Sequence, residues 1–114
     1  MKGIRGVLSL VVINGQRYGS FMIKSFRGRD TERLFKREQI QRLPFRLQRS
    51  GLRKLLILDA AERLADLKLP PGNRLEKLKG DRAGQFCIRI NDQWRVCFRW
   101  RDGDAYDVEI SDYH

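Results

Sequence analysis

The chain ends in Asp112, Tyr113 and His114, and His114 is the only histidine among its 114 residues. An unperturbed imidazole has a pKa of about 6.5, so it can donate or accept a proton near neutral pH. Terminal residues are usually frayed and tolerant of change, so a lone histidine at a chain end is more often without function than catalytic. Whether His114 has a role depends on what the fold places beside it.

Basic side chains near the end of the chain form the second group that could act on a substrate. The chain carries 24 Lys and Arg residues against 14 Asp and Glu residues, which gives a net charge of +10. Because the planar guanidinium group of arginine suits phosphate, a nucleic acid is the first partner to consider, with an anionic membrane or an acidic protein as alternatives. The candidate RNA-binding residues are Lys77, Arg82, Arg89, Arg99 and Arg101, with Trp94 as an aromatic member.

A basic surface beside a titratable group meets the needs of RNA cleavage without a metal. The 2′ oxygen of RNA can attack the adjacent phosphorus, so a protein needs to supply only a base, an acid and cations for the extra phosphate charge. His114 could serve as either acid or base, and Asp112 as a base or as an orienting group. Lys79 and Arg95 are the expected phosphate clamp, and Tyr113 could stack on a base or donate a hydrogen bond.

Other kinds of site are not indicated. Cys87 and Cys97 are too few for a disulfide framework, and one histidine gives no usual metal-ligand spacing, so we expect reduced thiols, no metal and no cofactor. No stretch approaches the roughly 18 to 20 apolar residues that a bilayer crossing needs. The segment "MKGIRGVLSLVVI" only faintly imitates a secretion signal, because no small-residue cleavage site follows it. The expected location is therefore the cytoplasm.

Alternation of apolar and polar residues predicts an antiparallel sheet in the last third of the chain. Between Gln85 and Ser111 almost every even position, Tyr106 included, is apolar and almost every odd position is polar, so one face should pack on the core. Opposed residues must share a face, which predicts three-residue loops at 91–93 and 102–104 instead of two-residue loops. The resulting pairs are Ile90 with Trp94, Cys87 with Cys97, Arg101 with Ala105, Arg99 with Asp107, and Arg95 with Ser111.

This register brings the end of the chain beside Trp94 and Arg95 and concentrates arginine on the solvent-exposed face of the central hairpin. A positive field in front of His114 is the functional interpretation. The simpler alternative is a solvated surface, since charged residues are common on exposed sheets and Arg99 would be partly neutralised by Asp107. A cross-strand disulfide between the opposed cysteines is sterically feasible in vitro.

Two helices are predicted before the sheet. Asp30 or Thr31 can cap the first, which runs through "ERLFKREQIQRL" and stops at Pro44. The second covers "GLRKLLILDAAERLADLKL" and ends at Pro70-Pro71-Gly72. Its expected core-facing residues are Leu52, Leu55, Leu56, Ala60, Leu64 and Leu67. The predicted fold class is therefore α+β, with two N-terminal helices packed on a small antiparallel β-sheet.

The first 21 residues differ from the rest of the chain. They carry three basic residues and no acidic residue, and turn signals occur at Asn14-Gly15 and Tyr18-Gly19. From Met22 the pattern becomes regular, and "MIKSF" alternates like a short strand. We interpret residues 1–21 as an N-terminal appendage, which arises from an upstream translation start or forms an extra edge strand. Residues 22–114 are the expected functional domain.

The stretch "PPGNRLEKLKGDRAGQFCIRINDQWRVCFRW", followed by "GDAYDVEISDYH" and preceded by the opening "MIKSF", closely resembles the HigB host-inhibition-of-growth toxins of the RelE superfamily. The resemblance covers residues 22–114. It implies a RelE-like domain that enters the A site of the 70S ribosome and cleaves the bound mRNA without a metal. It also implies a HigA-type antitoxin with a helix-turn-helix domain, through which alone the complex would reach operator DNA.

The motifs of this family carry functional positions onto the chain. The blocks "DYH", "LKGDR" and "NDQWR" imply the catalytic residues Asp112, Tyr113, His114, Lys79 and Arg95. Some members have a second histidine three residues before the lysine, where this chain has Glu76. A glutamate with an ordinary pKa is ionised at pH 7 and could act as a base but hardly as an acid. We therefore expect His114 to be the acid, with Asp112 or Glu76 as the base.

Two alternatives from other classes remain open. A basic domain could bind RNA or the ribosome without cutting, or could serve as a corepressor that acts only through its antitoxin. A membrane binder is disfavoured because no predicted helix has a strong division between basic and aromatic faces. Loss of function on removing His114 and Asp112 would distinguish a nuclease from a binding module.

Overall fold

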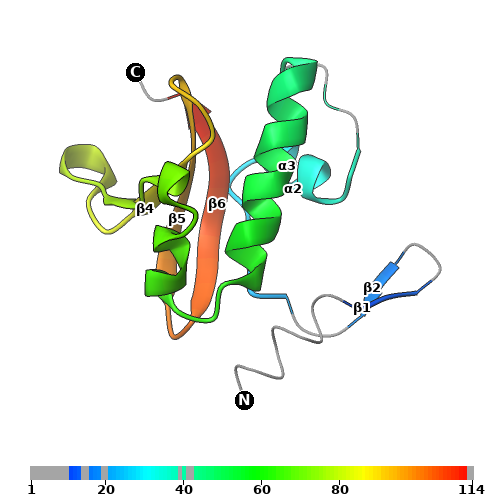
Figure 1. The fold of residues 1–114 in the computed structure, drawn as a ribbon, viewed down its shortest axis with the longest axis horizontal. Coiled ribbons are helices and arrows are strands. Elements are labelled where there is room, and N and C mark those ends of the chain that lie inside the picture. The colour runs from blue at the N-terminus through cyan, green and yellow to red at the C-terminus, as the bar shows by residue number, and fades with distance from the viewer. Residues whose placement is uncertain (1–10, 14–15, 19–20, 39, 41–42, 113–114) are drawn as a thin grey trace.

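The last third of the chain forms the predicted sheet. The structure is a computed structural model that describes the chain except residues 1–10, 14–15, 19–20, 39, 41–42 and 113–114. The sheet is antiparallel, in the order β3-β4-β5-β6. Its strands are β3 (Glu76–Lys77), β4 (Phe86–Arg89), β5 (Trp94–Arg101) and β6 (Asp104–Asp112). Helices α2 (Arg29–Phe35) and α3 (Phe45–Ala60) lie on one side of it (Figure 1), so the predicted α+β fold class is confirmed.

A short segment beside β6 extends this sheet. Residues Ile23 and Phe26 form parallel bridges with Ala105 and Val108, so the predicted strand "MIKSF" is present as an irregular strip. The strip is also tied to α3, because the buried carboxylate of Asp59 accepts the backbone N–H groups of residues 22 and 23 at 2.9 and 3.0 Å. These two bonds fasten the start of the strip to the end of the helix.

Two further strands precede the strip. Strands β1 (Val11–Ile13) and β2 (Gln16–Tyr18) pair with each other in a separate two-stranded antiparallel sheet. They belong to the segment that we interpret as an appendage. Because the pairing of β1 with β2 does not test a domain boundary, the boundary at Met22 stays a prediction.

The first helix is shorter than predicted. Helix α2 ends at Phe35, and Arg37 has a left-handed backbone with φ of 65°, so the chain turns well before Pro44. The side chain of Gln48 accepts from the backbone N–H of Ile40 at 3.1 Å and donates to its carbonyl. Since Ile40 is also buried, tertiary contacts hold it in a non-helical conformation that the helical pattern of the sequence concealed.

The second helix begins and ends earlier than predicted. Helix α3 starts at Phe45, directly after Pro44, and stops at Ala60, which is exposed and does not face the core. The apolar pattern continues beyond α3 because a separate 3-10 helix, η1 (Leu64–Lys68), contributes the buried side chain of Leu67 to the core. A second 3-10 turn, η2 (Pro71–Asn73), leads into the sheet. One helical period in the sequence therefore corresponds to two elements that share one core.

The core lies between α3 and the sheet. Its buried residues include Leu34, Leu55, Leu58 and Leu67 from the helical part and Ile88, Val96, Phe98, Ala105 and Val108 from the strands. Gly51 allows α3 to approach the sheet closely, since a Cβ atom there would lie 3.0 Å from Cδ1 of Ile110. None of the helices in the described part of the chain has the length and hydropathy that a membrane crossing needs.

The register of the first hairpin agrees with the prediction. Cys87 opposes Cys97 and Arg89 opposes Arg95 across β4 and β5. The N–H of Ile90 donates to the carbonyl of Trp94 at 3.0 Å, which closes the three-residue loop. The phase of the alternation, together with the three-residue loop, places these residues opposite each other.

The second hairpin has a different turn. Arg101 pairs with Asp104, and Asp102 and Gly103 both have positive φ, of 52° and 82°. The loop therefore contains two residues, and the predicted three-residue loop and the pairing of Arg101 with Ala105 are wrong. An Asp-Gly pair with positive φ at both positions is typical of the tight hairpin turn whose twist matches that of the strands.

A bulge restores the predicted phase further along β6. Arg99 pairs with Tyr106, the register shifts between Cys97 and Arg99, and Asp107 has a φ of 52°. The predicted direct pairing of Arg99 with Asp107 is therefore wrong, and so is the placing of Tyr106 on the core face. Ala105 takes the core position instead and is fully buried. Beyond the bulge Arg95 opposes Ser111, as predicted.

Candidate functional site

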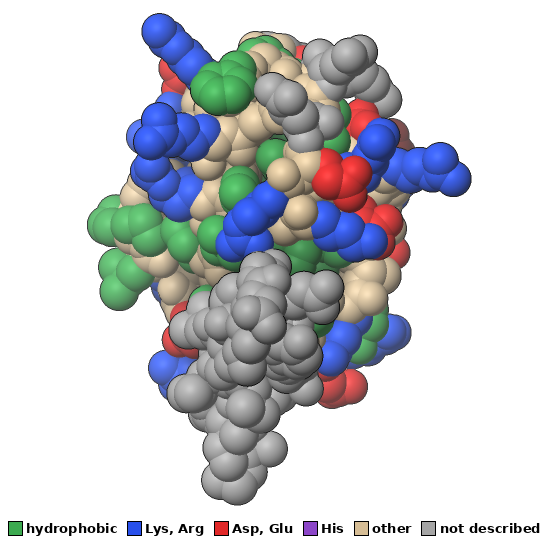
Figure 2. Space-filling model, turned by 90° about the vertical axis from the view of Figure 1, so that its right-hand side faces the viewer, with side chains coloured by type: hydrophobic (Ala, Val, Ile, Leu, Met, Phe, Trp, Pro, Cys, Tyr) green, Lys and Arg blue, Asp and Glu red, His purple; other side chains and the backbone are tan. Residues whose placement is uncertain are grey.

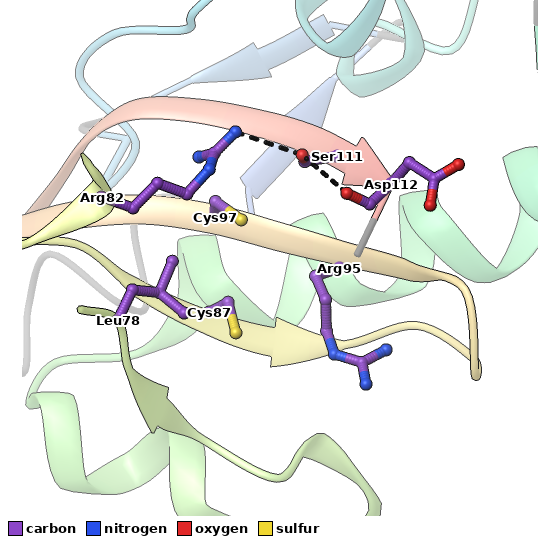
Figure 3. A pocket seen from close by; sticks show the side chains of 7 residues that line it. All are labelled: Leu78, Arg82, Cys87, Arg95, Cys97, Ser111 and Asp112. Carbon is purple, nitrogen blue, oxygen red and sulfur yellow. Dashed lines mark hydrogen bonds between the residues drawn. The ribbon is translucent and has the colours of Figure 1, made fainter. Parts of the chain in front are cut away.

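A cavity of about 160 Å³ forms the centre of the candidate site. It lies on the sheet face away from α3, between β4, β5, β6 and the loop that follows β3 (Figure 3). Three predicted site residues, Arg82, Arg95 and Asp112, come together in its lining. The complete lining is Leu78, Arg82, Cys87, Arg95, Cys97, Ser111 and Asp112.

Arg95 is oriented by backbone groups. Its Nη1 donates to the carbonyl of Asn91 and, at 3.2 Å, to that of Trp94. These bonds direct the guanidinium group toward the turn between β4 and β5, as Figure 3 shows. A cation that is held in place before substrate binds loses little freedom on binding, which suits the expected role on phosphate.

Arg82 anchors the loop after β3 to strand β6. Its Nη1 donates to Gln85 at 2.9 Å, and its Nη2 donates to the Glu109 carboxylate at 2.8 Å and to the Ser111 hydroxyl at 3.2 Å. The hydrogen bond to Glu109 raises the pKa of Arg82. This geometry favours a role in building the cavity wall. Direct contact of Arg82 with RNA stays a prediction.

Asp112 lies at the rim of the cavity. It opposes Trp94, so the register puts its side chain on the face opposite to that of Arg95 and Ser111. Figure 3 shows the carboxylate pointing away from the two thiols, and its Oδ2 accepts a hydrogen bond from Gln93 at 2.9 Å. The backbone carbonyl of Asp112, in contrast, accepts from the Ser111 hydroxyl at 3.4 Å. Asp112 therefore borders the cavity mainly through its backbone.

Tyr113 and His114 lie outside the described residues, so their predicted roles stay predictions. Lys79 is exposed at the start of the 3-10 helix η3 (Gly80–Arg82), in the loop that supplies Arg82 to the cavity. Glu76 is exposed on β3 and opposes Cys87, which places it on the same face as the cavity. These two residues flank the cavity on the β3 side without being among its lining residues.

Two thiols line the floor of the cavity, and the RNA-cleavage scheme expected from the sequence gives neither of them a role. Cys87 and Cys97 are 1% and 4% exposed, and both are free. Their mutual hydrogen bond and burial raise the pKa of Cys87. The same hydrogen bond lowers the pKa of Cys97, aided by the charges of Arg82 and Arg95 and opposed by burial. The alternation of the strands carried this information, since it already opposed the two cysteines.

The remaining RNA-binding candidates do not form one surface. Arg89 is ion-paired with Asp92 beside the first turn, and Arg99 is ion-paired with Asp107 at 3.6 Å. Lys77 opposes Phe86, whose ring stacks on the buried Phe98.

Lys77 therefore lies on the opposite face from the cavity, because opposed residues share a face. Trp94 is half-buried opposite Asp112, also off the cavity face. Of the predicted set, Arg89, Arg95, Arg99 and Arg101 share the cavity face. Three residues that the sequence pattern did not single out orient predicted site residues: Asn91 binds Arg95 through its carbonyl, Gln93 binds Asp112, and Glu109 binds Arg82.

A second basic surface lies on the helices. Figure 2 shows Lys and Arg side chains spread over the α2 and α3 side of the molecule, with fewer acidic ones between them. A hollow of about 480 Å³ is lined by Leu34, Arg37, Glu38, Phe45, Gln48, Arg49 and Leu52, and Phe45 is 72% exposed. The described residues include no group of three or more His, Cys, Asp or Glu side chains that could hold a metal ion.

The chain is similar to proteins of one family. The sequence model described as "RelE-like toxin of type II toxin-antitoxin system HigB" matches residues 24–114. The chain is 39% identical over 90 residues to Toxin HigB-1 of Vibrio cholerae, covering 78% of this chain and 95% of the relative. It is 32% identical over 93 residues to Endoribonuclease HigB of Proteus vulgaris, covering 82% of this chain and 100% of the relative.

Proposed function

The chain belongs to the HigB family of RelE-like toxins from type II toxin-antitoxin systems, and on this premise we propose that it cleaves mRNA in the ribosomal A site without a metal. It is a toxin endoribonuclease, as the family and the relative named Endoribonuclease HigB indicate. The site of action, the roles of single residues and the independence from metal are the proposed part.

The observation that carries this proposal is the pairing of the end of β6 with the start of β5. Arg95 opposes Ser111, and the next pair is Trp94 with Asp112. The first residue of the "DYH" block is thus held one strand away from the arginine of the "NDQWR" block. The loop with the "LKGDR" block closes the same cavity through Leu78 and Arg82. Three motifs far apart in sequence therefore border one hollow.

The proposed reaction is an internal transesterification. The 2′ hydroxyl of the RNA gives its proton to a base while its oxygen bonds to phosphorus. The bond from phosphorus to the 5′ oxygen then breaks, and an acid protonates that oxygen. We assign His114 as the acid and Asp112 or Glu76 as the base. Glu76 shares the cavity face, whereas the Asp112 carboxylate would need to act from the rim.

The cations and the aromatic group have separate tasks in this scheme. Arg95 and Lys79 bind the phosphate whose charge rises in the transition state, and groups held in place before the reaction act most strongly on such charge. Tyr113 stacks on a base or donates a hydrogen bond beside the scissile phosphate. Arg89, Arg99 and Arg101 extend the positive face along β4 and β5 toward the neighbouring nucleotides.

A type II toxin has an antitoxin partner, which follows from the family. We propose that this antitoxin is of the HigA type, with a helix-turn-helix domain that alone contacts operator DNA. We further propose that the other partners are mRNA and the 70S ribosome, so the toxin acts in the cytoplasm. The domain that does so is assigned to residues 22–114.

The test is the paired substitution of Asp112→Ala and His114→Ala in one chain. Brief induction of the wild-type toxin, followed by mapping of the 5′ ends of transcripts, should show new ends within translated regions. The double variant should lose these ends and the growth arrest while it keeps its affinity for ribosomes. Lys68→Ala, an exposed change far from the "DYH" block in sequence, serves as the control. A double variant that still arrests growth would show a binding module.

A further inference from the structure

We propose that the end of the β5–β6 hairpin carries a second RNA subsite, in which Arg101 and Tyr106 stack an unpaired nucleobase and Arg99 binds an adjacent phosphate. This inference rests on the proposed function for its choice of ligand, and it names a subsite for the same substrate. Tyr106 is the new residue, since the sequence pattern placed it in the core.

The subsite is a hollow of about 340 Å³ lined by Gly84, Arg99, Trp100, Arg101, Tyr106 and Asp107. In Figure 1 the β5–β6 turn lies at the opposite end of the sheet from the C-terminus. Arg101 lies six positions after Arg95 along β5, which is about 20 Å of strand. Both arginines are on the same face, so one RNA strand lying along β5 would cover both places.

The bulge in β6 creates this hollow. Asp107 has a left-handed backbone that is costly for a residue other than glycine. The conformation is held by a hydrogen bond from its N–H to the hydroxyl of Ser25, at 2.8 Å. As a result Ala105 and Val108 both face the core, while Tyr106 turns to the arginine side. Bulges beside functional sites commonly redirect a side chain in this way.

The side chains in the hollow are of the kinds that hold single-stranded RNA. The guanidinium group of Arg101 lies over the Tyr106 ring, 4.5 Å from its centre. Tyrosine rings and guanidinium planes both stack on unpaired bases. A base could therefore add as a third layer on Arg101 or take its place on the ring.

Arg99 is placed to meet the phosphate. It is ion-paired with Asp107 at 3.6 Å, and the two side chains are 47% and 53% exposed, so the pair contributes little and is readily exchanged for a phosphate contact. Gly84 leaves room for this side chain, because a Cβ atom there would lie 2.8 Å from Nη1 of Arg99. Gly84 lies two residues after Arg82, the last residue of the "LKGDR" block, which links the subsite to the wall of the candidate catalytic cavity.

The lining contains two arginines and one aspartate, so the hollow is cationic but only weakly so. Stacking, more than charge, should therefore determine what binds there. Every base has a face that stacks, so the subsite should favour single strands over duplexes and show little preference among base sequences.

The test measures binding of a fluorescent single-stranded RNA oligonucleotide to the purified toxin by anisotropy, with the duplex of the same sequence as a second probe. Tyr106→Ala should weaken binding of the single strand about tenfold, as expected for loss of one stacked base. Tyr106→Phe, the matched control, should stay within about twofold of wild type. Arg101→Ala should weaken binding more than Arg101→Lys, because lysine keeps the positive charge and loses only the planar guanidinium group that stacks on a base.

If Tyr106→Ala, shown to be folded by circular dichroism, bound the single strand as tightly as wild type, the proposed subsite would be overturned. An equal loss for the duplex would overturn it as well. These outcomes are separate from failure of the proposed function, because they do not require cleavage. If wild type cleaves mRNA on ribosomes, Tyr106→Ala should raise the toxin concentration needed for half-maximal cleavage and leave the maximal rate unchanged, which a merely structural role would not predict.

Discussion

Arg95 is the residue for which structure and expected chemistry agree best. Its guanidinium group is held by the carbonyls of Asn91 and Trp94 at the edge of the cavity. Asp112 illustrates the opposite case. The alternation of the strands correctly predicted that Asp112 lies beside Trp94. Because Asp112 is at an even position, its side chain points to the face away from Arg95. The sequence pattern therefore brought Arg95 and Asp112 to neighbouring strands, but the orientation of the carboxylate depends on a hydrogen bond from Gln93 that only the fold reveals.

A substitution at Arg95 tests this view. We predict that Arg95→Ala lowers the rate of mRNA cleavage by about 100-fold or more while RNA affinity falls only a few fold, because the cation acts on charge that develops in the transition state. Lys79→Ala should behave similarly. Single-turnover cleavage and equilibrium binding measure the two effects.

The control for these variants is Arg63→Ala, which removes a side chain that is 78% exposed. It should change neither the rate nor the affinity. Equal losses of rate and affinity in the Arg95 variant would contradict a role in the transition state and would favour simple attraction of RNA.

At the scale of elements, strand phase was predictable and helix ends were not. The period of two residues puts Cys87 and Cys97 on one face, and the three-residue loop at 91–93 makes them direct partners. Helix α2 ends early because the side chain of Gln48, from the next helix, binds the backbone of Ile40. Such a contact has no local pattern. The bulge could not be predicted for another reason. The two-residue turn shifts the register of β6 by one residue and the bulge shifts it back, so the alternation is the same beyond the bulge as for a three-residue loop without one.

The turn between β5 and β6 gives a prediction of its own. Gly103 has a φ of 82°, so Gly103→Ala should lower the free energy of unfolding by about 1 to 2 kcal/mol, the cost of a left-handed backbone for a residue with a Cβ atom. Asp102→Asn should be nearly neutral, because asparagine also tolerates positive φ. Urea unfolding of both variants measures the difference. A Gly103→Ala protein as stable as wild type would show that the turn relaxes to another form.

At the scale of the whole molecule, the domain boundary can be tested by changing where the chain starts. We predict that a chain beginning at Met22 keeps the fold and the toxicity, because the strip and its bonds to Asp59 remain. The free energy of unfolding should fall by about 1 kcal/mol, because the Phe21 ring, which contacts the Phe35 ring edge-on with 6.0 Å between the ring centres, is lost. Thermal unfolding and growth arrest are the measurements.

The matched control is a chain beginning at Arg27, which lacks the strip beside β6. It should be strongly destabilised, because the backbone bonds from the strip to Ala105 and Val108 are lost. If this shorter chain were as stable as the one beginning at Met22, the strip would not belong to the domain, and the proposed boundary would be wrong.

The position of β6 between β5 and the strip also bears on how the protein folds. Strand β6 pairs with β5, its neighbour in sequence, and with residues 23 and 26, and the bond from Asp107 to Ser25 spans 82 residues of sequence. Because contacts between such distant parts of a chain carry a large cost in loop-closure entropy, they slow folding. A fragment that lacks either β6 or the strip should therefore leave an edge of the sheet unpaired and exposed to aggregation.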